Sequence, residues 1–201
     1  MSRKLPPGRY EELKSSVADL IEDYGLTYPL QPLELADALG AQVVWYNFGL
    51  PSVASALRTD DGFTEPVRTS YGHAFRMHVN GQRPAIRQRF TVAHECGHIW
   101  LDHLVGRSAC TRDVMEVEAN FFAGYLLAPD ALIHQWVPSL TVDDIAATFE
   151  MSGEAATIAH RRHLNALNLN ALGRPHDQRI ASAATRRALT QATQLELPKE
   201  A

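Results

Sequence analysis

His94-Glu95-Cys96-Gly97-His98 is the stretch of this 201-residue chain that says most about its fold. Helical residues turn by about 100° each, so His94 and His98 lie on one face, where both imidazoles can reach a single ion. Glu95 points away from that axis and can act on a water molecule as a general base. The run is the motif of a zinc-dependent hydrolase centre. The structural alternative is an ordinary amphipathic helix that carries two histidines.

A catalytic zinc ion takes three protein ligands and keeps one position open, so a third ligand must come from another segment. Residues 113–129 read as a second helix, with Glu116 and Asn120 on one face at i, i+4. We expect Glu116 to bind the metal and Asn120 to hydrogen-bond a ligand histidine. Two alternatives remain open: Glu118 is the ligand, or Asp113 and Glu116 form a capping box.

Several segments around these positions together resemble the ImmA/IrrE-type metallopeptidases, over roughly residues 10 to 170. Cys96 departs from the bulky aliphatic residue usual at its position. It lies about 200° around the helix from His94, so we expect it to pack away from the metal. The segments that carry the resemblance are Met77-His-Val-Asn80, Arg87-Gln-Arg-Phe90-Thr-Val-Ala-His94-Glu-Cys-Gly-His98, Glu116-x-Glu-Ala-Asn120-x-Phe-Ala and Leu126-Leu-Ala-Pro129.

The resemblance implies an α+β, zincin-like (gluzincin-like) fold, in which a small twisted sheet packs on the HExxH helix and a glutamate-bearing helix follows. It implies one zinc ion held by His94, His98 and Glu116, with Glu95 as the catalytic base. The implied activity is site-specific cleavage of a helix-turn-helix repressor, which switches on mobile-element or stress-response genes. The partner would then be a protein substrate.

The segments before the zinc motif predict a mixture of helices and strands, with a turn-broken region between them. We expect helices over residues 9–24 and 33–39, strands over 41–48 and 75–80, and at most one weak strand within 49–72.

The strand expected over 75–80 has a candidate functional role, because gluzincin-like peptidases, which the chain resembles, run an edge strand along the zinc cleft. Phe75, Met77 and His78 are therefore candidates for binding an extended substrate by strand addition, the alternative being an ordinary sheet strand. Tyr71 and His73, together with His78, are candidates for stabilising the oxyanion at the scissile carbonyl.

Other polar residues have simpler interpretations. His103 follows His98 by five positions, which is wrong for the same helical face, so we expect a surface histidine. Arg87 and Arg89 flank the start of the zinc helix and are expected to form structural salt bridges. Cys110 is expected to be a small core or loop residue.

The region after the zinc helices has a helix-turn-helix rhythm, with Thr141 and Ser152 as caps of helices over 141–149 and 153–167. The start of the second helix, Ser152-Gly-Glu154-Ala-Ala-Thr, carries no Arg or Lys, so we expect scaffolding or substrate docking and no direct DNA binding. A last helix is expected over 178–194. The expected units are residues 1–135 (metallopeptidase), 136–172 (helix-turn-helix-like) and 173–201 (C-terminal helix and tail).

Composition fits a cytoplasmic protein without membrane insertion. The net charge is -4 and the pI about 6.1, which does not suggest a free-standing nucleic-acid binder. Two cysteines give no disulfide framework, and the first residues lack the apolar run of a signal peptide. The main alternative function is a regulatory module whose non-catalytic zinc site acts on a repressor or DNA without proteolysis. The intact Glu95 argues against it, because a structural zinc site has no use for that carboxylate. Hydrolysis of a small peptide or cell-wall fragment is the other alternative.

Overall fold

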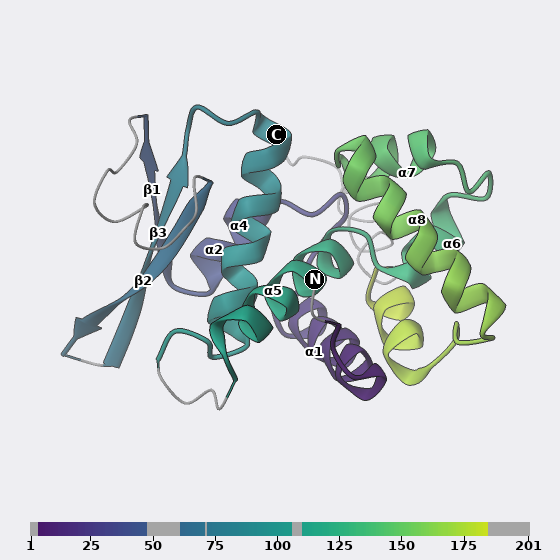
Figure 1. Cartoon of the computed structure of the whole chain (residues 1–201), viewed down its shortest axis with the longest axis horizontal. Helices are drawn as coiled ribbons and strands as arrows, with labels where there is room; N and C mark the ends of the chain where they lie inside the picture. The colour runs from purple at the N-terminus through teal and green to yellow at the C-terminus, as the bar shows by residue number, and fades with distance from the viewer. Residues whose placement is uncertain (1–3, 48–60, 71, 106–109, 185–201) are drawn as a thin grey trace, which may run out of the picture.

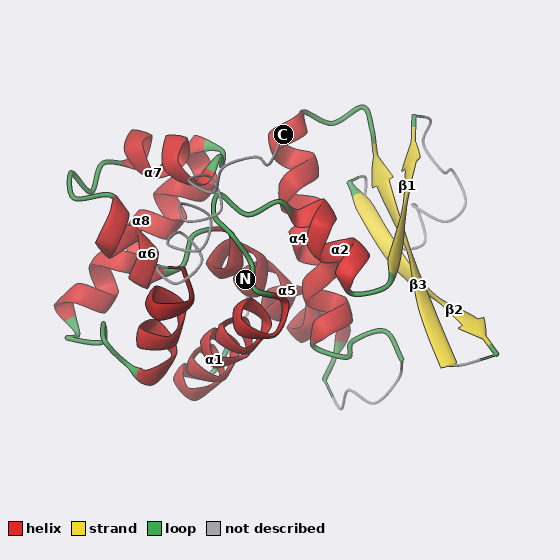
Figure 2. Ribbon diagram, turned by 180° about the vertical axis from the view of Figure 1, so that it is seen from behind, coloured by secondary structure: helices red, strands yellow, loops and turns green. Residues whose placement is uncertain are grey.

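The computed structural model describes residues 4–47, 61–70, 72–105 and 110–184. A three-stranded sheet lies at one end, and the described helices fill the rest of the molecule (Figure 1). The view from behind shows the same division, with these helices on one side of the sheet (Figure 2). The expected α+β class is confirmed.

Two helices come first in the described part, α1 (Pro7–Tyr24) and α2 (Pro32–Ala38). Each begins with a proline, whose missing N–H would have no partner in the first turn in any case. α1 ends at Gly25, where φ is 55°, a left-handed conformation that glycine adopts without strain. Both helices match the sequence-based prediction. The fully buried apolar residues of α1 are Leu13, Val17, Ala18, Leu20 and Ile21.

The sheet consists of β1 (Ala41–Tyr46), β2 (Gly62–Thr69) and β3 (Gly72–Asn80), in the order β1-β3-β2. β3 pairs parallel with β1 and antiparallel with β2, so it is the central strand. The prediction that β3 offers an edge for strand addition is therefore wrong, because its backbone groups are bonded on both sides. Within 49–72, the structure has a regular eight-residue strand, β2, where only a weak one was expected.

The zinc motif lies on α4 (Ala85–Trp100), which packs against the sheet, and α5 (Arg112–Leu127) packs against α4. The two helices approach closely at Gly97, where an added Cβ would lie 3.1 Å from Cδ1 of Phe122. The N-cap of α5 is Thr111, so the alternative of a capping box that starts at Asp113 is wrong.

Three further helices and a final helical segment complete the described part. Thr141 Oγ1 accepts a hydrogen bond from the backbone N–H of Asp144 at 3.1 Å, and Ser152 Oγ accepts one from Ala155 at 3.2 Å. Both predicted caps are confirmed. The last predicted helix, 178–194, lies outside the described residues beyond 184. The elements are α6 (Asp130–Trp136), α7 (Val142–Phe149), α8 (Gly153–Asn168) and helical residues 175–184.

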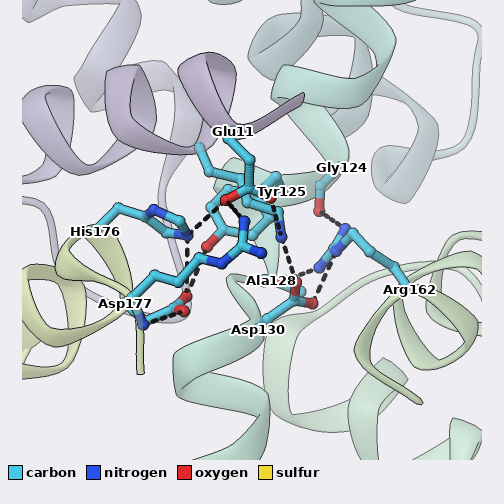
Figure 3. Close-up of polar contacts among 10 residues, drawn as sticks. Glu11, Gly124, Tyr125, Ala128, Asp130, Arg162, His176 and Asp177 are labelled. Atoms are coloured by element: carbon cyan, nitrogen blue, oxygen red, sulfur yellow. Dashed lines mark hydrogen bonds and ion pairs between the residues drawn. The ribbon is translucent and has the colours of Figure 1, made fainter. Parts of the chain in front are cut away.

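A network of charged and polar side chains joins α1 and α5 to the last helices (Figure 3). Arg162 of α8 donates from Nε to Asp130 Oδ1 at 2.8 Å, and Lys14 Nζ of α1 lies 3.5 Å from the other oxygen of Asp130. The hydroxyl of Tyr125 donates to Asp177 at 3.2 Å. We call this the Asp130 network, made up of Glu11, Lys14, Tyr125, Asp130, Arg162, Arg174, His176 and Asp177.

One apolar core runs from the sheet to the last helices. It contains Met77 of β3, Val92 of α4, Phe122 of α5, Phe149 of α7 and Ile180. The sheet and the zinc-motif helices are thus held by the same core as α7 and the final helical segment. Across the described ranges, the structure has no helix that is both long and apolar enough to span a membrane.

Candidate metal centre

Three potential ligand atoms converge between α4 and α5. His94 Nε2 and His98 Nε2 lie 3.0 Å apart, because the two residues occupy consecutive turns of α4. Glu116 comes from the second turn of α5, with Oε2 at 3.4 Å from His94 Nε2 and Oε1 at 3.7 Å from His98 Nε2. One ligand atom from each of these residues lies within 4.8 Å of the other two.

These separations fit a small ion in a tetrahedral site. Zinc binds His and Glu at about 2.0–2.2 Å, which places two ligands of a tetrahedral ion about 3.3 Å apart. The observed 3.0, 3.4 and 3.7 Å bracket that value. Two imidazoles and one carboxylate also form a donor set typical of catalytic zinc, which leaves the fourth position for water or substrate.

The carboxylate of Glu116 is held in its charged form. The imidazoles of His94 and then His98, which face its oxygens, lower the pKa of Glu116 well below its ordinary value, although partial burial acts in the opposite direction. The cluster thus combines one carboxylate with two imidazole nitrogens. The cluster therefore has the charge and the geometry to bind a divalent cation.

An open cleft of about 830 Å³ lies beside this cluster. Glu95 lines it next to His94 and is only 6% exposed, so its carboxylate is largely shielded from bulk water. β2 supplies one wall through Phe63 and Thr64, and Phe90 lies on the α4 side. The cleft thus brings the expected base and the metal-ligand cluster beside β2, which is an outer strand of the sheet in the part of the chain that the structure describes.

Asn120 lines the cleft on α5, on the face that also carries Glu116. The hydrogen bond expected from it to a ligand histidine does not occur in the described residues. His98 Nδ1 is paired with His103, and His94 Nδ1 is buried without a hydrogen-bond partner there.

The expectation that His103 is a surface histidine is wrong. It is 9% exposed, not on the surface, and its Nδ1 lies 3.0 Å from Nδ1 of His98. α4 ends in a Schellman motif, in which the N–H of His103 bonds the carbonyl of His98 and that of Asp102 bonds Ile99. Asp102 has φ 56°, so the chain reverses and returns His103 to the last turn of the helix.

Glu118, the alternative ligand, points to other partners. It is 2% exposed and accepts hydrogen bonds from Arg9 Nε at 2.6 Å and from His103 Nε2 at 3.0 Å. Burial alone would raise the pKa of Glu118, but Arg9 and His103 outweigh it and lower the pKa. The convergent cluster accordingly contains Glu116 and not Glu118.

The predicted substrate-binding residues of β3 do not line the cleft. Met77 is fully buried in the core, and Phe75 packs against that core. His78 reaches the cleft only indirectly, since its ring stacks on Phe63 at 4.5 Å. His73 is exposed, and Tyr71 lies outside the described residues.

The remaining polar expectations have mixed outcomes. Arg87 binds Asp61 at 2.6 Å and Arg89 binds Glu150 at 3.1 Å, which confirms structural salt bridges for both. Cys96 is fully buried in the core, and burial raises the pKa of its thiol. Cys110 is exposed. Three cleft residues were not predicted: Phe63 and Thr64, because β2 was not recognised as a regular strand, and Phe90, because nothing in the pattern of α4 shows which of its residues faces the cleft.

Comparison with known proteins places these features in a family of peptidases. Residues 56–161 match the Peptidase_M78 family, described as an IrrE N-terminal-like domain, and the chain belongs to that family. The chain is also similar to the uncharacterized immunity region protein 2 of Bacillus phage phi105. The two are 29% identical over 167 residues, which is 80% of this chain and 94% of the phage protein. The resemblance to ImmA/IrrE-type proteins is thereby confirmed.

Proposed function

We propose that this protein is a zinc-dependent endopeptidase that cleaves a helix-turn-helix transcriptional repressor and thereby derepresses mobile-element or stress-response genes. The observation that carries the proposal is the convergence of His94, His98 and Glu116 on one point at the wall of an open cleft, with Glu95 beside them. Three N/O ligands and a free carboxylate are the requirements of a hydrolytic zinc site.

The side chains divide the chemistry between them. His94, His98 and Glu116 would hold one zinc ion, which supplies Lewis-acid activation of water and of the scissile carbonyl. Glu95 takes the proton from the attacking water and returns it to the leaving amine. Its carboxylate does not belong to the ligand cluster, so it is free to do so. Asn120, on the same cleft wall, is proposed to support the site.

The substrate would bind along β2 and not along β3. Among the described residues, β2 is the outer strand of the sheet on the cleft side, and its first residues form part of the cleft wall. An extended peptide that adds to this edge gains main-chain hydrogen bonds, while side-chain pockets give selectivity. Phe63 and Phe90 offer apolar surface for one substrate side chain, and His78 holds the ring of Phe63 by stacking.

The regulatory role is supported by the family and by the name of the phage relative, which places that protein in an immunity region. The resemblance to ImmA/IrrE-type peptidases implies cleavage of a repressor, so a repressor is the substrate class we propose. The helix-turn-helix-like unit (136–172) is proposed as a scaffold or docking element, with 1–135 as the metallopeptidase unit and 173–201 as a C-terminal helix and tail. α8 is fixed to the rest by the bond from Arg162 to Asp130.

A trapping experiment tests the proposed function. Glu95→Gln should keep zinc and lose about 100- to 10,000-fold in turnover, the usual contribution of a general base. We would use the zinc-loaded variant to capture partners from a host extract and identify them by mass spectrometry. Each captured partner is then incubated with the wild-type protein, with zinc or with a chelator.

A helix-turn-helix protein that is cut only with zinc and only by the wild type supports regulatory proteolysis. A partner that binds but stays intact with the zinc-loaded wild type would instead favour the non-catalytic regulatory module.

A further inference from the structure

A line of buried polar contacts runs from the metal centre to the N-terminal helix. His98 Nδ1 lies 3.0 Å from His103 Nδ1, and His103 Nε2 lies 3.0 Å from Glu118 Oε2. Arg9 of α1 completes the line with Nε at 2.6 Å and Nη2 at 3.1 Å from the two oxygens of Glu118. We call His103, Glu118 and Arg9 the His103 bridge.

The positions of the protons in this bridge follow from its carboxylate end. Glu118 is an acceptor only, so His103 Nε2 must carry the proton that faces it. A neutral His103 then has an unprotonated Nδ1, which can accept a bond only if His98 Nδ1 carries a proton. That leaves His98 Nε2 with a free lone pair, and Nε2 is the atom that points at Glu116 and His94.

We propose that His103 is a positioning residue of the metal centre. His103 is anchored by Glu118 and Arg9, and it holds His98 in the tautomer and ring orientation that binds a cation through Nε2. The proposal rests on the metal site proposed above. A metal-ligating histidine commonly donates its other ring N–H to an outer partner, which fixes its orientation and raises its basicity. Here that partner is a second imidazole, itself fixed by a buried carboxylate.

The side chains that link His98 to Glu118 are buried. The exposed fractions of His98, His103 and Glu118 are 7%, 9% and 2%, so bulk water competes little for these hydrogen bonds. Arg9 lies outside the span that matches the family, residues 56–161. The N-terminal helix therefore contributes an anchor to the metal centre, although it supplies no ligand.

Substitution of His103 tests the proposal through metal affinity. His103→Leu removes both hydrogen bonds at similar volume and should weaken zinc binding by about 10- to 100-fold, measured by competition with a chromogenic chelator. His103→Gln is the matched control, because its amide oxygen can accept from His98 and its NH₂ can donate to Glu118. It should restore most of the lost affinity. A folded His103→Leu protein that binds zinc as tightly as the wild type would overturn the proposal.

The ¹⁵N spectrum of the imidazoles in the metal-free wild type gives a second, independent readout. We expect His98 as the Nδ1–H tautomer and His103 as the Nε2–H tautomer, with His98 losing its single tautomer in His103→Leu. If His103→Leu fails to fold, the wild-type spectrum decides alone, since a protonated Nε2 at His98 contradicts the proposal. The spectrum also tests the role of His103 separately from the proposed peptidase function. If the wild type failed to bind zinc, the proposed function would be wrong, but the tautomers of His98 and His103 could still be measured.

Arg9 is tested by a matched pair of arginines. Arg9→Ala leaves the Glu118 carboxylate without two of its donors and should weaken zinc binding less than His103→Leu does, by at most about tenfold, the lower end of the range for outer partners. Arg179→Ala is the control, since Arg179 also pairs with carboxylates of α1 and has a similar exposed fraction, 37% against 35%. Equal zinc affinities in the two variants would remove Arg9 from the bridge.

Discussion

The candidate metal centre and the Asp130 network are both clusters of ionisable side chains on α5 and its neighbours, yet they are built in opposite ways. In the metal centre, two imidazoles and a carboxylate converge on one point beside an open cleft. In the Asp130 network, acids are paired with basic side chains. Asp130 lies between Lys14 of α1 and Arg162 of α8, and its pairing with Arg162 is drawn in Figure 3.

The difference separates a site built for a ligand from a contact built for stability. The nitrogen and carboxylate ligand atoms of the metal centre converge on one point that solvent can reach, so a cation can be bound there. Buried acids matched by bases already have their partners, and loss of one partner leaves an uncompensated charge in the interior. We therefore expect substitutions in the metal centre to change metal affinity, and substitutions in the network to change the free energy of unfolding.

Among the substitutions that test this difference between the two clusters, Glu116→Ala should have the largest effect, which is on zinc affinity. It removes a direct ligand, so zinc affinity should fall by more than about 100-fold, the upper end of the loss for outer partners. The stability of the metal-free protein should change little, because the Glu116 side chain is 44% exposed. Zinc analysis by competition and urea unfolding measure the two quantities. If Glu116→Ala kept its zinc and Glu118→Ala lost it, the ligand would be Glu118.

Arg162→Leu should produce the reverse result. Asp130 is 1% exposed at its side chain, so loss of its arginine partner should cost about 3–5 kcal/mol in the free energy of unfolding. Zinc affinity of the folded fraction should stay unchanged. Arg161→Leu is the control, since Arg161 is the exposed neighbour on the same helix. Equal urea midpoints for the two variants would contradict the structural role of the network.

Gly97→Ala tests the packing contact between α4 and α5. Of the three substitutions it should have the smallest effect, a loss in the free energy of unfolding. Its Cβ would meet Phe122 Cδ1 at 3.1 Å, so the Phe122 ring must move by a few tenths of an ångström in a packed core, at a cost of about 1–3 kcal/mol. Gly124→Ala on α5 is the matched control, because an added Cβ there meets nothing within 4 Å. Alanine also favours a helix over glycine, so that variant should be neutral or more stable. Destabilisation of both to the same extent would show that packing at Gly97 is not the cause.

The parts of the molecule predicted best are those with short-range signals. Thr141 and Ser152 cap helices because a hydroxyl followed by a helical pattern satisfies backbone N–H groups locally. His94 and His98 come together because helical geometry alone sets their spacing. Glu116 also joined them, although the sequence left Glu118 open as an alternative. The choice of Glu116 rested on the face that it shares with Asn120 at i, i+4, and the resemblance to the family, now confirmed, implied the same residue.

The misses come from contacts that the local pattern does not encode. Strand order placed β3 at the centre and β2 beside the cleft, and alternation within a strand does not reveal its neighbours. His103 was assigned to the surface because the helix was assumed to continue in register. In the structure, Asp102 takes a left-handed conformation more typical of glycine at a helix end, and that single turn returns His103 to His98.

The end of α4 has a consequence for the engineering of metal sites. The positions joined by the longer bond of a Schellman motif are five residues apart, and their side chains commonly meet. A designer who places a metal ligand in the last turn of a helix can therefore place its orienting partner on the same short segment. The other helices of the designed site would then need to supply only the remaining ligands. Fewer independent elements must therefore be positioned accurately.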